Sequence, residues 1–307
     1  MWAPIFSLDE VLREARDLGS AVTAAVVATD SHVLDVALLA AQQGLIAPIL
    51  IGRPDEVKSA CAIHACQYPV LAAQTAEQAA MLGVQEVKQG RAHMLIKGHL
   101  HTSEFLHPIL AELRHADRLS HVFVGQISGH TKLLYITDAA INIAPDLITK
   151  VGIVNNAVKL ARAMGIERPK VAAISAIETI NTAIPSTLDA ACLAKMAERG
   201  QIKHAILDGP LALDDAVSAE ASRIKGINSS VAGDVDILLM PDLVSGNALY
   251  KAMTYFAGAH FAGIVLGASV PVVLASRADT METHLASIAL ARVAHERMHQ
   301  SSGKDFR

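Results

Sequence analysis

Apolar and polar stretches alternate along the chain at short intervals. Short apolar runs bounded by polar residues are typical of buried strands, whereas apolar residues recurring on one face predict helices. Strands are expected at 22–28, 48–52, 93–98, 170–175, 204–208 and 235–242. Helices are expected at 32–43, 146–164, 186–200 (capped by Ser186), 212–224 and 280–300, and two more begin near Pro54 and Asn247. This alternation predicts an α/β fold with a parallel sheet between layers of helices.

Two stretches depart from the simple alternation. The apolar runs 121–127 and 132–138 are joined by Ser128-Gly129-His130, which predicts an antiparallel hairpin. From Ala252 to Ser276 the chain has no Asp, Glu, Lys or Arg, but glycines and Pro271 interrupt this stretch. It therefore predicts a helix end and two short strands rather than a membrane span.

The composition supports this fold class and excludes some partners. The 307 residues are 52% hydrophobic and only 4% aromatic, so the apolar mass is aliphatic, as in helices packed on buried parallel strands. The net charge is −4 and no basic stripe is present, so neither nucleic acid nor an acidic membrane is an expected partner. The first residues lack the apolar core of a signal peptide, and we expect a cytoplasmic location.

Polar residues follow the predicted strands where each strand ends. They are Lys97-Gly98, Asp138, Glu178, Asp208-Gly209-Pro210, Pro241-Asp242 and Ser276-Arg277. In open α/β sheets this edge is where ligands bind. A guanidinium there can give two parallel hydrogen bonds to a phosphate. We therefore interpret Arg277 as an anion-binding residue rather than a surface charge.

Three further places carry candidate polar groups. Thr102 and Ser103 open a predicted helix, where hydroxyls and backbone N–H groups can bind an anion, although helix capping alone would explain them. Asp208 and Asp242, the latter followed by Asn247, stand at strand ends, where turn formation is the alternative explanation.

Several common kinds of site have no sequence support. We find no glycine-rich dinucleotide or Walker motif and no nucleophile elbow. Cys61, His64 and Cys66 have the spacing of part of a metal site but lack a second ligand pair, and the histidines near Glu104 are equally incomplete. No metal is expected.

Six longer blocks resemble the phosphate acetyltransferase/phosphate butyryltransferase family. They are "KGHLHTSEFL", "TDAAINIAPDL", "STLDAACLAKMAERGQI", "DGPLALD", "VAGDVDILLMPDLVSGNALYKAMTYFAGA" and "PVVLASRAD". The resemblance runs in register from about Val22 to Ala291, and "TDAAINIAP" and "SRAD" are closer to the butyryltransferase-like branch.

The resemblance implies two three-layer α/β domains of the isocitrate/isopropylmalate dehydrogenase-like fold, with the active site in a cleft between them. We place the first domain at 1–140 with 270–307 and the second at 141–269. The implied activity is reversible transfer of an acetyl or butyryl group between coenzyme A and inorganic phosphate by a homodimer or higher oligomer. The resemblance implies coenzyme A as a substrate and implies no cofactor.

The resemblance also implies roles for particular residues. Ser276 and Arg277 match the pair that binds the phosphoryl end of the acyl phosphate. Other expected substrate-binding residues are Lys97, Thr102, Ser103, Asp208, Asp242 and Asn247. Thr283 stands where the acetyltransferases have an aspartate, the proposed base for the thiol, and threonine cannot take that role.

Two alternatives remain open from the residues alone. Thr283 suits a non-catalytic protein that binds coenzyme A or acyl phosphate without turnover. A metal-dependent dehydrogenase of the same fold would need clustered aspartates, and Asp208 and Asp242 are far apart in sequence.

Overall fold

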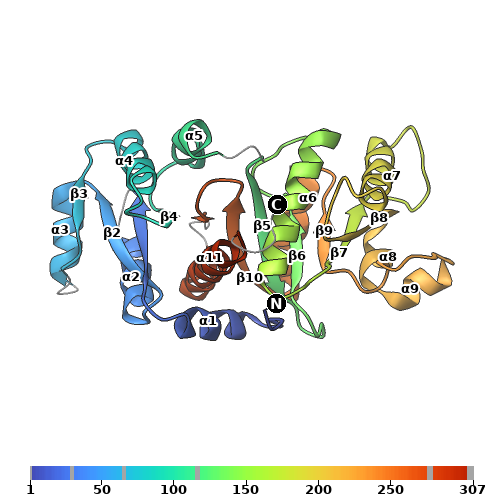
Figure 1. Cartoon of the computed structure of the whole chain (residues 1–307), viewed down its shortest axis with the longest axis horizontal. Coiled ribbons are helices and arrows are strands. Elements are labelled where there is room, and N and C mark those ends of the chain that lie inside the picture. The colour runs from blue at the N-terminus through green and yellow to red at the C-terminus, as the bar shows by residue number, and fades with distance from the viewer. Residues whose placement is uncertain (1, 28–30, 64–66, 115–117, 275–278, 303–307) are drawn as a thin grey trace. The chain divides into compact units, whose positions relative to one another are not determined.

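The computed structural model describes residues 2–27, 31–63, 67–114, 118–274 and 279–302. Helices and strands alternate along these residues (Figure 1), which confirms the predicted α/β class. Contacts within the chain divide it into two compact units. Unit 1 consists of Met1–Leu8 and Ser120–Phe261, and unit 2 of Asp9–Leu119 and Ala262–Arg307.

Unit 2 is built on a largely parallel set of strands. They are β1 (Val22–Val27), β2 (Ile46–Gly52), β3 (Val70–Ala72), β4 (Met94–Lys97), β11 (Val272–Val273) and the part of β10 (His260–Leu266) that follows Phe261. β1 lies between β2 and β4, β3 extends the sheet beyond β2, and β11 pairs in parallel with β4. β10 pairs with β11 in the antiparallel direction. Thus β4 and β11 end at the same edge.

The helices of unit 2 are α1 (Leu8–Asp17), α2 (Ser31–Gln42), α3 (Pro54–Ile63), α4 (Ala76–Lys88), α5 (Thr102–Glu112) and α11 (Met281–Ser302). Sequence analysis missed α4, although Thr75 caps it by accepting a hydrogen bond from the Gln78 backbone at 3.1 Å. Its buried face consists largely of alanine, glycine and valine. Small residues of this kind give little apolar periodicity, which is why the pattern failed to show the helix.

One buried arginine ties the loops of unit 2 to its last helix. Arg292 of α11 is 0% exposed, and its guanidinium donates hydrogen bonds to the carbonyls of Leu45 at 2.6 Å and Ser20 at 3.0 Å. These carbonyls lie just before β2 and β1. Burial is tolerated because the two terminal nitrogens of the guanidinium find backbone acceptors.

Unit 1 begins with the predicted hairpin. β5 (Ser120–Gln126) pairs antiparallel with β6 (Leu134–Thr137), with Phe123 opposite Ile136, so this prediction is confirmed. Beyond β6 follow β9 (Ile237–Leu239), β7 (Lys170–Ile174) and β8 (Ile206–Leu211), all parallel. β8 runs to Leu211, so Asp208 lies inside this strand. The prediction that a strand ends at Asp208 was wrong, because Gly209-Pro210 did not break the strand.

The helices of unit 1 are α6 (Leu147–Ala163), α7 (Pro185–Glu198), α8 (Leu213–Val217), α9 (Ala219–Ile224) and α10 (Leu243–Ala257). The single helix predicted at 212–224 is wrong, since Ser218 is extended and its hydroxyl caps α9. Ser186 is not the cap of α7 as predicted, because the helix starts one residue earlier with Pro185, which suits a first helical position.

An aromatic cluster packs α10 on the hairpin of unit 1. The ring of Phe123 stacks on Tyr250 with centroids 3.8 Å apart, and Phe261 meets Tyr250 edge-on at 5.2 Å. A Cβ atom at Gly125 would come within 2.2 Å of the Phe261 ring, so only glycine fits there. These contacts fix the helix whose first turn borders the pocket described next.

The uncharged stretch near the C-terminus is also as predicted within the part that the structure describes. It contains the end of α10, then β10 and β11. No helix among the described residues is both long and apolar enough to span a bilayer.

Candidate active site

Unit 1 has a pocket of about 560 Å3 at the carboxyl ends of β7 and β9. These strands are parallel neighbours, so the loops that follow them leave the sheet at the same edge. The pocket is lined by those two loops and by the beginnings of α6, α7 and α10. This is the edge at which open α/β sheets bind ligands.

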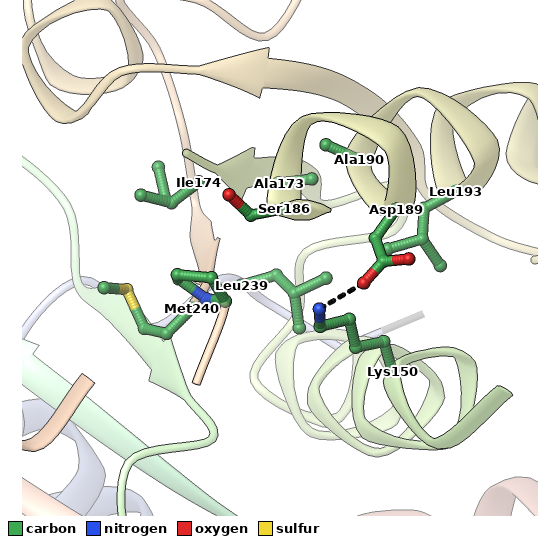
Figure 2. A pocket seen from close by; sticks show the side chains of 10 residues that line it. Lys150, Ala173, Ile174, Ser186, Asp189, Ala190, Leu193, Leu239 and Met240 are labelled. Atoms are coloured by element: carbon green, nitrogen blue, oxygen red, sulfur yellow. Dashed lines mark hydrogen bonds and ion pairs between the residues drawn. The ribbon is translucent and has the colours of Figure 1, made fainter. Parts of the chain in front are cut away.

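An ion pair forms one wall of the pocket. Lys150 of α6 is 5% exposed, and its Nζ lies 2.6 Å from Oδ2 of Asp189 in α7. Figure 2 shows the two side chains reaching towards each other from their helices. A buried ammonium needs such a partner because desolvation of an unpaired charge is costly.

Two serine hydroxyls lie beside this pair. Ser175 directly follows β7 and is 6% exposed, and its Oγ is 2.8 Å from Oγ of Ser186 in the first turn of α7. Both serines line the pocket. Because a hydroxyl can donate one hydrogen bond and accept others, the pair keeps capacity for a further polar group.

Asp242, one of the predicted site residues, borders the same pocket. It is the N-cap of α10, and its Oδ1 accepts a hydrogen bond from the backbone N–H of Ser245 at 2.9 Å. The Ser245 hydroxyl donates to the Asp242 carbonyl at 3.1 Å and also lines the pocket. The predicted strand end at Asp242 is thus a pocket wall and a helix cap at once.

Asn247 contacts the loop after β6. Its Nδ2 donates to the Ala139 carbonyl at 3.1 Å. In that loop Asp138 is 2% exposed and accepts hydrogen bonds from the backbone N–H groups of Ala140 and Ile141. Burial raises the pKa of Asp138, and these hydrogen bonds offset part of the rise. Asn247 of α10 thus packs against the loop that holds Asp138.

Asp208 is half-buried within β8, and its Oδ1 accepts a hydrogen bond from the Gly209 backbone at 2.8 Å. It is not among the residues that line the pocket of unit 1. The structure therefore brings Asp242 to the pocket and leaves Asp208 outside it.

The other predicted residues belong to unit 2. Lys97 ends β4, is 8% exposed, and donates from Nζ to the Gly98 carbonyl at 3.3 Å. Thr102 and Ser103 are exposed in the first turn of α5, after the N-cap His101. The predicted strand end and helix start are thus confirmed.

Ser276 and Arg277 lie outside the described residues. The chain leaves β11 at the edge where Lys97 ends β4, since the two strands are parallel. Further along the chain, Thr283 lies in the first turn of α11, where its backbone N–H donates to Oγ1 of Thr280 at 3.3 Å.

A sequence profile described as "Phosphate acetyl/butaryl transferase" matches residues 65–292. The chain belongs to the phosphate acetyl/butyryl transferase family. It is 47% identical to a phosphate acetyltransferase of Rhizobium meliloti over 289 residues, which cover 92% of each chain. It is 43% identical to a phosphate butyryltransferase of Clostridium acetobutylicum over 293 residues, which cover 94% of this chain and 97% of the relative.

A solved relative shows the same fold. A branched-chain phosphotransacylase from Enterococcus faecalis V583 superposes with a TM-score of 0.80 at 30% identity, covering 89% of this chain and 99% of that one. The resemblance found in the sequence is confirmed, and family membership makes the chain an acyltransferase. The matched region of this phosphate acyltransferase includes the pocket of unit 1 and the predicted residues of both units.

Sequence reasoning missed the ion pair of the pocket. Lys150 and Asp189 lie inside two different helices, 39 residues apart, and no local motif joins them. Ser175 was within reach of the strand-end rule, because it directly follows β7. The sequence could therefore have indicated Ser175 by its position after a strand, but it gave no spacing that pairs Lys150 with Asp189.

The described residues offer no obvious metal centre. Within these ranges no three His, Cys, Asp or Glu side chains are grouped so that they could hold a metal ion. Of the three residues Cys61, His64 and Cys66, whose spacing resembles part of a metal site, only Cys61 lies in the described part of the chain.

Proposed function

We propose that this chain transfers a short acyl group reversibly between coenzyme A and inorganic phosphate, with an acyl phosphate as the second product or substrate. The observation that carries the proposal is family membership over most of the chain. Its relatives bear the names of both an acetyltransferase and a butyryltransferase. We therefore place acetyl and butyryl groups in the acyl range.

The phosphoryl end of the acyl phosphate requires positive charge and directed donors, because its negative charge grows as it leaves. We assign this role to Arg277 and Ser276, since a guanidinium can give two parallel hydrogen bonds to one phosphate. Thr102 and Ser103, exposed at the start of α5, are the proposed additional donors. The parallel pairing of β4 with β11 supports this grouping within unit 2.

The transfer itself needs a thiolate. The thiol of coenzyme A, with a reference pKa of about 8.5, loses its proton, and the sulfur then attacks the carbonyl carbon of the acyl phosphate. The new C–S bond forms as the bond between the carbonyl carbon and the bridging oxygen breaks. Phosphate leaves with that electron pair, and in the overall reaction it carries the proton that the thiol has lost. Positive charge near the sulfur would lower the thiol pKa and so supply part of the help that a carboxylate base gives. The chemistry uses no metal or redox cofactor.

The finer structural expectations are part of this proposal. They are two three-layer α/β domains of the isocitrate/isopropylmalate dehydrogenase-like fold, a homodimer or higher oligomer, and a cytoplasmic location. The similarity to the solved phosphotransacylase supports the fold. The domain limits 1–140 with 270–307 and 141–269 stay a prediction.

A second candidate is a non-catalytic protein that binds the same ligands. Thr283 at the first turn of α11 favours it, because a hydroxyl at this position cannot take a proton from a thiol. It predicts binding of coenzyme A without turnover.

The deciding experiment is formation of acyl-CoA from coenzyme A and a series of acyl phosphates from acetyl to butyryl. Arg277→Gln should reduce kcat/KM about a hundredfold, the typical effect of removing one preorganised donor to a developing anion. Arg53→Gln, which removes an exposed arginine of unit 2, serves as the control. A folded wild-type protein that turns over none of these acyl phosphates contradicts the proposal.

A further inference from the structure

The proposed transfer needs a group that takes the proton of the thiol. By its resemblance to the acetyltransferases, Thr283 stands where an aspartate is expected, and its hydroxyl cannot accept that proton. An imidazole, with a reference pKa of about 6.5, is a closer match to a thiol of about 8.5 than a carboxylate of about 4. A histidine near the first turn of α11 would therefore suit this role better than a carboxylate.

Two histidines lie together at the edge of unit 2 where its parallel strands end. His32 is in the first turn of α2, the helix after β1, and His284 is in the first turn of α11, the helix after β11. β1 and β11 both pair in parallel with β4, so the two helices begin at the edge where Lys97 ends β4. The two imidazole rings meet edge to face at 88°, with centroids 5.5 Å apart. The chain that leaves β11 at this edge continues to Ser276 and Arg277, the proposed phosphate-binding pair.

Hydrogen bonds fix the turn that carries His284. Ser287, one turn further along α11, is 1% exposed. Its hydroxyl donates to the Thr283 carbonyl at 2.8 Å and accepts from the backbone N–H of Gly263 in β10 at 2.9 Å. The first turn of α11 is thereby joined to the sheet. Because His284 is itself only 6% exposed, its ring is a fixed surface against which the ring of His32 packs.

His32 is exposed, so a substrate can reach its ring, and an edge-to-face contact favours one orientation of such a pair. α11 packs on α2, β4 and β11, and the other titratable residues of these three elements are Asp35 and Lys97. The acids nearest to Thr283 in sequence are Asp279, just before α11, and Glu282, in its first turn. These two acids are the rival proton acceptors.

We propose that His32 accepts the thiol proton of coenzyme A and that His284 positions the ring of His32. The S–H bond breaks, the proton passes to the neutral imidazole of His32, and the sulfur keeps the electron pair as a thiolate. The thiolate attacks the carbonyl carbon of the acyl phosphate, and the imidazolium then returns the proton to the departing phosphate. The inference rests on the proposed function, and it gives the transfer a proton acceptor although position 283 is a threonine.

The test measures kcat/KM for coenzyme A in acyl-CoA formation as a function of pH, for the wild type and His32→Gln. The wild-type value should rise through about pH 6.5, where an imidazole ordinarily loses its proton. His32→Gln should be about a hundredfold lower at neutral pH. Its value should rise only near about pH 8.5, where the thiol ionises without help. The loss should therefore shrink as the pH rises, which a merely structural defect would not do.

Two further histidine variants separate positioning from an unspecific effect. His107→Gln removes an exposed histidine of α5 and is the matched control, so it should equal the wild type at every pH. His284→Gln should lower kcat about tenfold and leave KM for the acyl phosphate unchanged, because the ring of His32 loses its support. The rise near about pH 6.5 should remain in His284→Gln, since His32 is still present. Circular dichroism confirms that each variant is folded.

Three results overturn the inference while the wild type forms acyl-CoA and the proposed function stands. Folded His32→Gln keeps the wild-type kcat/KM at neutral pH, or its loss is the same at every pH, or Asp279→Asn or Glu282→Gln abolishes the rise near about pH 6.5 instead. A wild type that forms no acyl-CoA contradicts the proposed function and this inference together.

Discussion

Lysine–aspartate pairs lie near both ends of the parallel strands β6, β9 and β7 of unit 1, and the two ends differ in exposure and surroundings. At the amino ends, Lys132 and Lys170 each lie 2.8 Å or less from a carboxylate oxygen of Asp234, which is 60% exposed. At the carboxyl ends, the pair is Lys150 with Asp189, and Lys150 is 5% exposed beside a pocket.

The amino-end network joins the beginnings of the strands. Besides its bonds to Asp234, Lys132 donates to Oδ1 of Asp236 at 2.7 Å, while Oδ2 of Asp236 accepts from the Lys170 backbone at 2.8 Å. These residues stand just before or at the start of β6, β9 and β7. The comparison teaches that similar ion pairs join the beginnings of strands at one end of a sheet and form the wall of a pocket at the other.

The largest expected effect comes from breaking one pair at each end. Asp189→Asn leaves the ammonium of Lys150 buried without its carboxylate and should lower the free energy of unfolding by about 3 kcal/mol, the lower part of the range for buried pairs. Lys170→Gln removes only one partner of an exposed carboxylate and should cost about 1 kcal/mol or less. Urea unfolding at neutral pH measures both.

The difference between the two variants is the informative quantity. Lys195→Gln, which removes an exposed pair with Glu198 on α7, provides a baseline for an ordinary surface charge. If Asp189→Asn and Lys170→Gln lowered the free energy of unfolding equally, burial would not explain a difference between the ion pairs at the two ends of the strands.

A smaller effect should appear in the dependence of stability on pH, with opposite signs at the two ends. Hydrogen bonds from Lys132 and Lys170 lower the pKa of Asp234 below its ordinary 3.8. Its contribution to stability is therefore present above pH 3.8 and is lost as the pH falls through the folded-state pKa. At the carboxyl end, burial raises the pKa of Asp138 above 3.8. The folded protein then holds a proton that the unfolded chain releases, so stability falls as the pH rises through this window.

Unfolding free energies measured from about pH 3 to about pH 6 check these signs. Asp234→Asn should remove part of the rise in stability at the acid end of the range. Asp138→Asn should remove the fall in the free energy of unfolding that the wild type shows as the pH rises, whatever its effect on absolute stability. If the two substitutions changed the pH dependence of the free energy of unfolding with the same sign, the account would be contradicted. That account attributes the pKa of Asp138 to burial and the pKa of Asp234 to ion pairing.

Much of this fold could be predicted from the sequence, and the failures have physical causes. The hairpin of β5 and β6 was found because two apolar runs flank a short polar turn. α4 was missed because its buried face is made of small residues, and the break at Ser218 was missed because the apolar pattern continues across it. Local periodicity reports burial, and it is weak where side chains are small or where a cap interrupts a continuous pattern.

The candidate site was predicted in part for a related reason. Asp242 follows a strand, so its place at the pocket could be predicted from the order of the elements. Lys150 and Asp189 meet only because α6 and α7 pack side by side, and their pairing depends on tertiary structure. Helix packing decides such contacts, and neither residue type nor spacing reveals them.

The central claim is that this chain transfers an acyl group between coenzyme A and phosphate, with Arg277 binding the acyl phosphate. The most direct measurement is steady-state acyl-CoA formation by the wild type, Arg277→Lys and the control Arg53→Gln, with both substrates varied. We predict that Arg277→Lys raises KM for the acyl phosphate alone, since lysine lacks the paired donors, and that Arg53→Gln changes neither KM. An unchanged KM for the acyl phosphate in Arg277→Lys, or no acyl-CoA from the wild type, would contradict the claim.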